Sequence, residues 1–393
     1  MSASDPSNLI DLQTRVLSGP KLVDRLGELA LAEGARRVLV VTDPGVMAIG
    51  HAQRGMESLR ASGLEVGVFE DVHQDPTTLD AQACASAMAD HRADFLVGLG
   101  GGSSIDTAKA GNFLFTNGGE MRDYWGFGKA AKPMLPLIAV PTTAGTGSEV
   151  QSYALIADAE SHTKMACGDR KAAPRVALLD PTLTLSVPHE VTAHTGMDTV
   201  THAVECAVTR TASPFSSMLA REAFRLGHTA LPQVLAHPAD LDARGRMQTS
   251  ACLAGMAIEA SMLGAAHALA NPLTASFDLP HGEAVGLFLP GVVRFNGRDP
   301  YVAGAYRDLA VSAGICAPED SSAKAVMELV ARLGELLDLA GMPRSIAACG
   351  VKEGDLPALA GGAASQWTAG HNPVPVSEAD LLMLYQGALS TAR

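Results

Sequence analysis

Short apolar segments alternate with helix-like segments in the first half of the chain. Five of these segments, at residues 37–41, 64–69, 95–99, 136–140 and 176–179, are rich in valine, leucine and other apolar residues. Strands that are apolar on both faces and separated by helices are typical of a parallel sheet covered by helices on each side. The pattern therefore predicts an α/β fold with a parallel, Rossmann-like sheet for this half.

The pattern changes after Asp180 and Pro181. From Val191 onward the chain is rich in alanine, leucine and methionine, and it contains no clear strand. This half is predicted to be all-helical. A chain of 393 residues is also too long for one ordinary core. We therefore expect two domains, residues 1–185 and 186–393.

The longest apolar stretch, residues 251–273, approaches the length that spans a bilayer. It carries Glu259, His267 and Asn271, whose polar groups are costly in hydrocarbon. We predict one buried helix here and no membrane partner. The first eight residues are polar and lack the features of a secretion signal, so the expected location is the cytoplasm.

Charge and composition exclude other classes. The 42 acidic residues outnumber the 29 basic ones and give a net charge of −13, so no nucleic-acid partner is expected. Hydrophobic residues make up 47% of the chain and charged residues only 18%, which indicates large cores or subunit contacts. The six cysteines are far apart and include no C-x-x-C pair, so they are predicted to be reduced.

A glycine-rich loop follows the third predicted strand. Gly100, Gly101, Gly102 and Ser103 come directly before a helical sequence that contains Asp106. Residues without Cβ let an anion approach the backbone, and the amides at the start of a helix attract it. The loop is predicted to bind a pyrophosphate. The alternative is a plain turn capped by Ser103 and Asp106.

Two further polar features follow predicted strands. A loop with Thr142, Thr143 and Thr146 follows the fourth strand, and Asp43 follows the first. Ligands of doubly wound sheets bind beyond the carboxyl ends of the strands, where these features are expected to lie. Asp43 is placed to accept a ribose 2′-hydroxyl and repel a 2′-phosphate, which favours NAD over NADP. A plain turn residue is the alternative.

Candidate metal ligands occur in the helical half. Asp198 and His202 are four residues apart, so on a helix both face the same way. His267 lies in an apolar segment, where an unpaired imidazole would cost about 1–3 kcal/mol, and His281 follows. Each histidine alone would be interpreted as a hydrogen-bonded core or surface residue. As a set, these residues suit Fe(II), Zn(II) or Mn(II) at a Lewis-acid site.

Together these motifs resemble the iron-containing (group III) alcohol dehydrogenase family over nearly the whole chain. The similar segments follow in the same order at residues 75–77, 100–109, 141–149, 179–181 and 195–205, and around His267 and His281. The resemblance implies a cofactor-binding α/β domain, an all-α domain and a metal in the cleft between them. Dehydroquinate synthase has a related architecture.

The resemblance also implies roles for single residues. The four metal ligands would be Asp198, His202, His267 and His281. The cofactor would contact the 100–103 loop, Thr142, Thr143, Thr146 and Lys164. Such enzymes commonly form dimers or larger assemblies, so we expect a homodimer or a larger homo-oligomer.

One position departs from the family. Many relatives carry a histidine four residues after the third ligand, where this chain has Asn271. An amide can orient a substrate hydroxyl but cannot titrate. We therefore expect Asn271 to orient the substrate, and a proton route through water, the cofactor ribose or another group.

The predicted activity is hydride transfer between a primary or secondary alcohol, or its aldehyde or ketone, and NAD(P), aided by a metal. Two alternatives share the same residues: a lyase like dehydroquinate synthase, which uses NAD transiently, and a metal-dependent hydrolase. The metal-free maleylacetate reductases are disfavoured because all four ligand positions are filled.

Overall fold

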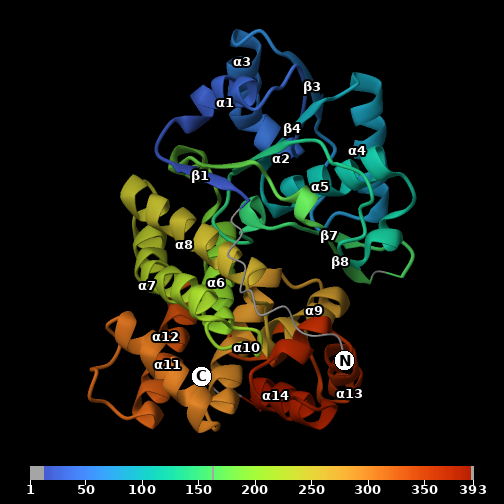
Figure 1. The fold of residues 1–393 in the computed structure, drawn as a ribbon. Helices are drawn as coiled ribbons and strands as arrows, with labels where there is room; N and C mark the ends of the chain where they lie inside the picture. Colours follow the sequence, from blue (N-terminus) through green and yellow to red (C-terminus); the bar gives the residue numbers. More distant parts are fainter. Residues whose placement is uncertain (1–12, 162, 391–393) are drawn as a thin grey trace.

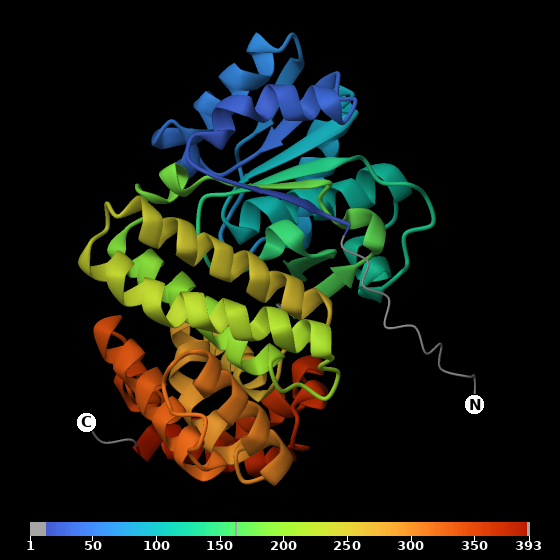
Figure 2. The same cartoon turned by 60° about the vertical axis from the view of Figure 1, so that its left-hand side comes forward.

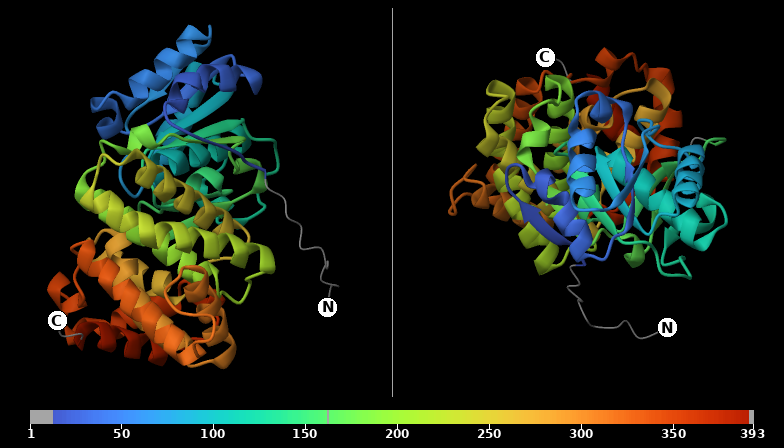
Figure 3. Two further views of the ribbon diagram at one scale, coloured as in Figure 1. Left: turned by 90° about the vertical axis from the view of Figure 1, so that its left-hand side faces the viewer. Right: turned by 90° about the horizontal axis from the view of Figure 1, so that it is seen from above.

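The computed structural model describes residues 13–161 and 163–390. Figure 1 shows the α/β half in blue to green above the helical half in yellow to red. Figure 2 and the left view of Figure 3 show α7 (Pro214–Ala236) and α8 (Leu241–Glu259) across the middle of the molecule, with the last helices at the far end from the sheet. The predicted class, a parallel α/β half followed by a helical half, is confirmed.

Six parallel strands form the main sheet, in the order β1-β9-β6-β4-β2-β3. They are β1 (Arg15–Ser18), β2 (Arg37–Val41), β3 (Glu65–Phe69), β4 (Phe95–Gly100), β6 (Leu137–Pro141) and β9 (Val176–Leu179). All five predicted strands are present, and their ends differ from the prediction by at most one residue. β1 was missed because its four residues include only two half-buried positions, which leave little apolar signal.

Both faces of this sheet are buried, as predicted. On one face, Val38 and Val40 pack with residues of α1 (Leu26–Ala32) and α3 (His51–Ala61). On the other, Leu39 and Val41 pack with residues of α4 (Thr78–His91) and α5 (Gly102–Asn117). Alternate residues of a strand face opposite sides, so a strand covered by helices on both sides must be apolar throughout.

A small second sheet was not predicted. β7 (Tyr153–Ala157) and β8 (Lys164–Gly168) form an antiparallel pair, and the two-residue strand β5 (Gly126–Phe127) runs parallel to β8. Residues of β7 alternate between half-buried and buried positions, so they show no continuous apolar run. This sheet carries Tyr153 and Lys164 to the candidate site.

Nine helices follow the main sheet in the described part of the helical half. They are α6 (His189–Cys206), α7, α8, α9 (Ala265–Phe277), α10 (His281–Asn296), α11 (Pro300–Ser312), α12 (Ser322–Leu339), α13 (Leu356–Ala364) and α14 (Glu378–Ser390). The expected boundary between residues 185 and 186 falls between a short 3-10 turn, Pro181–Thr184, and α6.

The prediction of one helix over residues 251–273 is wrong. α8 ends at Glu259, and α9 begins at Ala265 after an N-cap at Gly264. The amides of Gly264 and Ala266 donate to the carboxylate of Glu205 on α6, at 3.0 and 2.7 Å. These bonds satisfy the open start of α9 and explain why the chain breaks here and restarts just before His267.

The two halves meet backbone to backbone at Gly147 and Gly255. A Cβ on Gly147, which has φ +65°, would lie 2.5 Å from Cα of Gly255 on α8. Nearby, Ala177 and Leu179 of β9 pack with Cys252 of α8. The loop after β6 is thereby held against the helical half.

Two predictions from the sequence concern membrane-spanning helices and the state of the cysteines. Within the described residues, no helix combines the length and the apolar character that crossing a bilayer requires. All six cysteines are free; Cys316 and Cys349 are half-buried and the other four are buried.

Candidate active site

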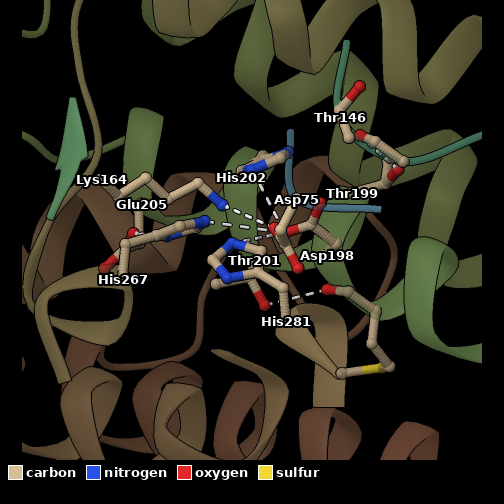
Figure 4. A network of polar contacts seen from close by, with 12 residues as sticks. Asp75, Thr146, Lys164, Asp198, Thr199, Thr201, His202, Glu205, His267 and His281 are labelled. Carbon is tan, nitrogen blue, oxygen red and sulfur yellow. Dashed lines mark hydrogen bonds and ion pairs between the residues drawn. The ribbon is translucent and has the colours of Figure 1, made fainter. Parts of the chain in front are cut away.

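Three helices bring the four candidate ligands together. Asp198 and His202 lie one turn apart on α6, His267 lies in the first turn of α9, and His281 begins α10. Figure 4 shows their side chains converging. Nε2 of His202, His267 and His281 lies 3.2, 3.6 and 3.8 Å from Oδ1 of Asp198.

Two atoms at the centre of this cluster lie at ion-pair distance from each other but make no hydrogen bond. Oδ1 of Asp198 and Nε2 of His267 are buried and have no hydrogen-bond partner within residues 13–161 and 163–390. An unpaired buried acceptor is costly, and a cation placed between several acceptors would remove that cost. One carboxylate oxygen and three imidazole nitrogens are a donor set that suits Fe(II), Zn(II) or Mn(II). The ligand atoms of Asp198, His267 and His281 lie within 4.8 Å of one another and His202 approaches Asp198, so the residues present fit a divalent cation.

Glu205 supports the cluster through a hydrogen bond with His267. Its carboxylate accepts a hydrogen bond from Nδ1 of His267 at 2.6 Å, as well as those from Gly264 and Ala266. A carboxylate on one ring nitrogen fixes the tautomer and orientation that let the other nitrogen bind a metal. Glu205 was not predicted, although its position seven residues after Asp198 places it on the same face of α6.

The charges of the cluster favour a bound positive charge. Burial raises the pKa of Asp198, but the neighbouring imidazoles outweigh burial and hold that pKa below its ordinary value. Burial also lowers the pKa of His267, yet the carboxylates of Glu205 and Asp198 dominate and raise it to about 9. For His281 burial dominates and lowers the pKa to about 3, so this imidazole is neutral.

A cleft of about 160 Å³ connects the cluster with the glycine-rich loop. Of the predicted residues, its lining includes Asp198, His202, His267, His281, Asn271, Gly102, Ser103, Asp106, Thr146 and Lys164. Residues predicted separately from the two halves of the chain therefore face one cleft.

The start of α5 packs closely against the loop after β6. Gly101 is the N-cap and Gly102 the first helical residue. A Cβ on Gly102 would lie 2.6 Å from Cγ2 of Thr146, so the two loops pass too closely for any side chain there. The alternative of a turn capped by Ser103 is wrong, because Ser103 lies inside the helix. The Asp106 carboxylate instead accepts from the Ser148 hydroxyl and, at 3.1 Å, from the amide of Leu155.

Five predicted cofactor residues lie outside the lining of this cleft: Asp43, Gly100, Gly101, Thr142 and Thr143. They nevertheless lie in or next to the glycine-rich loop at residues 100–103. The amide of Thr142 donates to the carbonyl of Gly100 at 2.9 Å, and the Ser104 hydroxyl donates to Oδ2 of Asp43 at 3.2 Å. Oδ1 of Asp43 accepts from the amide of Val46 at 3.0 Å and caps α2 (Pro44–Ala48), a local structural role like the one named as its alternative.

A buried lysine holds the second loop in place. Lys109 on α5 donates from Nζ to the carbonyl and the hydroxyl of Ser148, at 2.7 and 2.8 Å, and to the carbonyl of Tyr153 at 2.8 Å. Burial lowers its pKa, although nearby carboxylates oppose this shift. Lys109 lies in the motif that begins at Gly100, but sequence reasoning gave it no role.

An ion pair lies in the lining of the same cleft. Nζ of Lys164 is 3.2 Å from Oδ1 of Asp75, and its charge lowers the pKa of that carboxyl. Asp75 has a left-handed backbone, with φ +50°, just before Pro76. Asp75 lies in one of the segments that resemble the family but was given no role, and Trp367 and Thr368 were missed because a short 3-10 turn shows no periodic pattern.

The sequence matches known families over most of its length. A family described as "Iron-containing alcohol dehydrogenase" matches residues 13–181, and one described as "Fe-containing alcohol dehydrogenase family, C-terminal" matches residues 192–389. The NAD-dependent methanol dehydrogenase of Bacillus methanolicus is 32% identical over 94% of this chain and 97% of its own. The 1,3-propanediol dehydrogenase of Klebsiella pneumoniae is 32% identical over 94% of this chain and 96% of its own.

Several solved structures are similar to this chain over nearly its whole length. A crystal structure of 1,3-propanediol oxidoreductase covers 97% of this chain and 100% of its own, with a TM-score of 0.93 and 31% identity. An alcohol dehydrogenase from Oenococcus oeni covers 95% and 97%, with a TM-score of 0.90 and 31% identity. The sulfoacetaldehyde reductase of Bifidobacterium kashiwanohense, solved in complex with NAD+, covers 97% and 98%, with a TM-score of 0.86 and 29% identity.

These similarities favour alcohol oxidoreduction over the lyase and the hydrolase that the sequence left open. The family models account for both halves of the chain, and the relatives match it nearly end to end. The chain belongs to the iron-containing alcohol dehydrogenase family.

Proposed function

We propose that this NAD-dependent alcohol dehydrogenase works in the cleft between its halves, with Asp198, His202, His267 and His281 holding one divalent cation. The observation that carries the proposal is that the buried atoms Asp198 Oδ1 and His267 Nε2 lie 3.6 Å apart and make no hydrogen bond within the described residues. The family description favours Fe(II), and Zn(II) or Mn(II) would accept the same ligands.

The cofactor side of the cleft is proposed to lie in the α/β half, residues 1–185. The bare backbone at residues 100–102 and the start of α5 would hold the pyrophosphate of NAD, flanked by Ser103, Asp106 and the threonines of the second loop. Lys164 would approach a phosphate, and Asp43 would face the adenosine ribose. The helical half, residues 186–393, would supply the metal ligands and most of the substrate contacts.

When bound, the cation would supply Lewis acidity that favours loss of the alcohol proton, and the nicotinamide would accept the hydride. The chain's own task is alignment. Glu205 fixes the ring of His267, and Lys109 fixes the loop that carries Thr146 and Ser148. Asn271 would orient the substrate and cannot take its proton, so the proton would leave through water, the cofactor ribose or another group.

The substrate is proposed to be a small alcohol or its aldehyde, since the relatives are named for methanol and 1,3-propanediol. We also propose a cytoplasmic enzyme that forms a homodimer or a larger homo-oligomer. The low charged fraction of 18% is compatible with extensive subunit contacts.

Anaerobically prepared enzyme, assayed with a panel of alcohols and both NAD+ and NADP+, tests the proposal. We expect net formation of NADH that depends on the alcohol and is lost on chelation. Hydrolytic or lyase turnover without net NADH would contradict it.

A further inference from the structure

The ion pair between Lys164 and Asp75 lies in the same cleft as the ligand set. Nζ of Lys164, on β8, is 3.2 Å from Oδ1 of Asp75, and Figure 4 shows the two side chains pointing toward each other. Both residues line the cleft together with His281 and Asn271. The proposed reaction places Lys164 near the cofactor but gives Asp75 no task.

The backbone holds both partners of this pair in place. The amide of Ala157 on β7 donates to the carbonyl of Pro76 at 2.9 Å, and Ala157 is the register partner of Lys164 in the antiparallel pair. One strand therefore fixes both the loop that carries Asp75 and the strand that carries Lys164. Asp75 has a left-handed backbone, with φ +50°, a conformation that aspartate and asparagine adopt more readily than most residues. The two charges are thus brought together by the fold.

The charge of Lys164 acts on the ligand set. Burial is the main cause of the low pKa of His281, and the charge of Lys164 lowers that pKa further, although Asp198 acts in the opposite direction. The charge of Lys164 is also the main cause of the lowered pKa of Asp75. Charges interact strongly in a cleft from which bound ligands exclude water. A lysine without a partner at this place would attract an anionic substrate.

We propose that Asp75 is a specificity-determining residue, which neutralises Lys164 so that the cleft accepts uncharged aldehydes and alcohols and disfavours those that carry a carboxylate. With the ion pair intact, a substrate carboxylate would lose its hydration without gaining a free cationic partner. Removing the charge of Asp75 would leave the ammonium group of Lys164 available to that carboxylate. This inference rests on the proposed function, because the reacting end of the substrate must lie at the ligand set.

Two aldehydes test the inference in wild-type enzyme. Pentanal is uncharged, whereas 4-oxobutanoate carries a carboxylate, and the reduction of each is followed through the oxidation of NADH. We expect kcat/KM to be at least about tenfold higher for pentanal. Equal values, or a preference for 4-oxobutanoate, would overturn the inference and leave the proposed function standing. If no aldehyde or alcohol supports NAD(P)-linked turnover, the proposed function falls, and this inference with it.

Variants assign the preference to the ion pair. Asp75→Asn keeps the size of the side chain and suits the left-handed backbone, and it should lower the pentanal-to-4-oxobutanoate ratio of kcat/KM by about tenfold. Lys164→Met should raise that ratio, because the remaining carboxylate repels the anion, and the double variant should return close to the wild-type ratio. Both aldehydes are reduced with the same cofactor, so a change in NADH binding cancels in the ratio.

Asp320 provides the matched control. Its carboxylate lies 2.8 Å from Nζ of Lys324, but neither residue lines the cleft. Asp320→Asn should therefore leave the ratio unchanged. A ratio that stays unchanged in Asp75→Asn, or that falls equally in Asp320→Asn, would refute the role of Asp75. Lys164→Met tests the pair independently of the loop around Asp75, and a ratio that does not rise there would refute it as well.

Discussion

The Glu205 carboxylate accepts a hydrogen bond from Nδ1 of His267 at 2.6 Å, and Nε2 of the same ring lies 3.6 Å from Oδ1 of Asp198. One imidazole thus connects a supporting carboxylate to the proposed ligand set. Glu205 also closes the break between α8 and α9, so it ties the position of His267 to the path of the backbone.

Replacing Glu205 with Gln should weaken metal binding about 10- to 100-fold, because the amide cannot accept all the hydrogen bonds that the two carboxylate oxygens now take. Competition with a chelator, followed by elemental analysis, measures the change. Glu259→Gln is the control, since the Glu259 carboxylate accepts hydrogen bonds from Ser152 on the cofactor side and makes none with the four candidate ligands within the described residues. Equal metal affinity in Glu205→Gln and wild type would show that Glu205 is not needed for binding.

Asp43 allows charge and capping to be tested separately. Asp43→Asn keeps a side chain that can cap α2 but removes the negative charge, so it should fold normally and narrow the preference for NAD over NADP. Asp43→Ala should narrow the preference equally and also lose about 1 kcal/mol of stability. Steady-state kinetics with both cofactors and thermal melts provide the readouts. A preference that is unchanged in both variants would remove Asp43 from the cofactor site.

The contact of Gly147 with Gly255 should be intolerant of side chains. A Cβ on Gly255 would lie 2.6 Å from the carbonyl oxygen of Gly147, and neither backbone can move away cheaply. Gly255→Ala should therefore cost about 1–3 kcal/mol and raise KM for NAD+, because the loop that carries Thr146 would shift. Gly304→Ala on α11, with open space around it, is the control for a helical glycine. An unchanged melting temperature in Gly255→Ala would mean that the two halves do not depend on this contact.

Much of the fold was predictable because buried parallel strands leave an unmistakable apolar signal. The five strands from β2 to β9 in the main sheet were found for this reason, whereas β1 and β7 are half-buried and were not. The break between α8 and α9 was missed because the sequence there remains apolar. The reason for the break is the long-range hydrogen bonding of Glu205, which no local pattern reveals.

The candidate site was also predicted only in part. Asp198, His202, His267 and His281 stood out as polar residues at helical spacing or in apolar surroundings, and the structure brings them together. Trp367 and Thr368 were missed as lining residues because they lie in a turn that only the tertiary fold places beside α9.

The metal content of anaerobically purified enzyme tests the central claim most directly. It should be measured in wild type, in His267→Ala and in His189→Ala, whose exposed histidine at the start of α6 is the matched control. We predict about one divalent ion per chain in wild type and the control, and loss of both metal and alcohol-dependent NADH formation in His267→Ala, with NAD+ binding retained. Full metal content and normal turnover in His267→Ala would contradict the account.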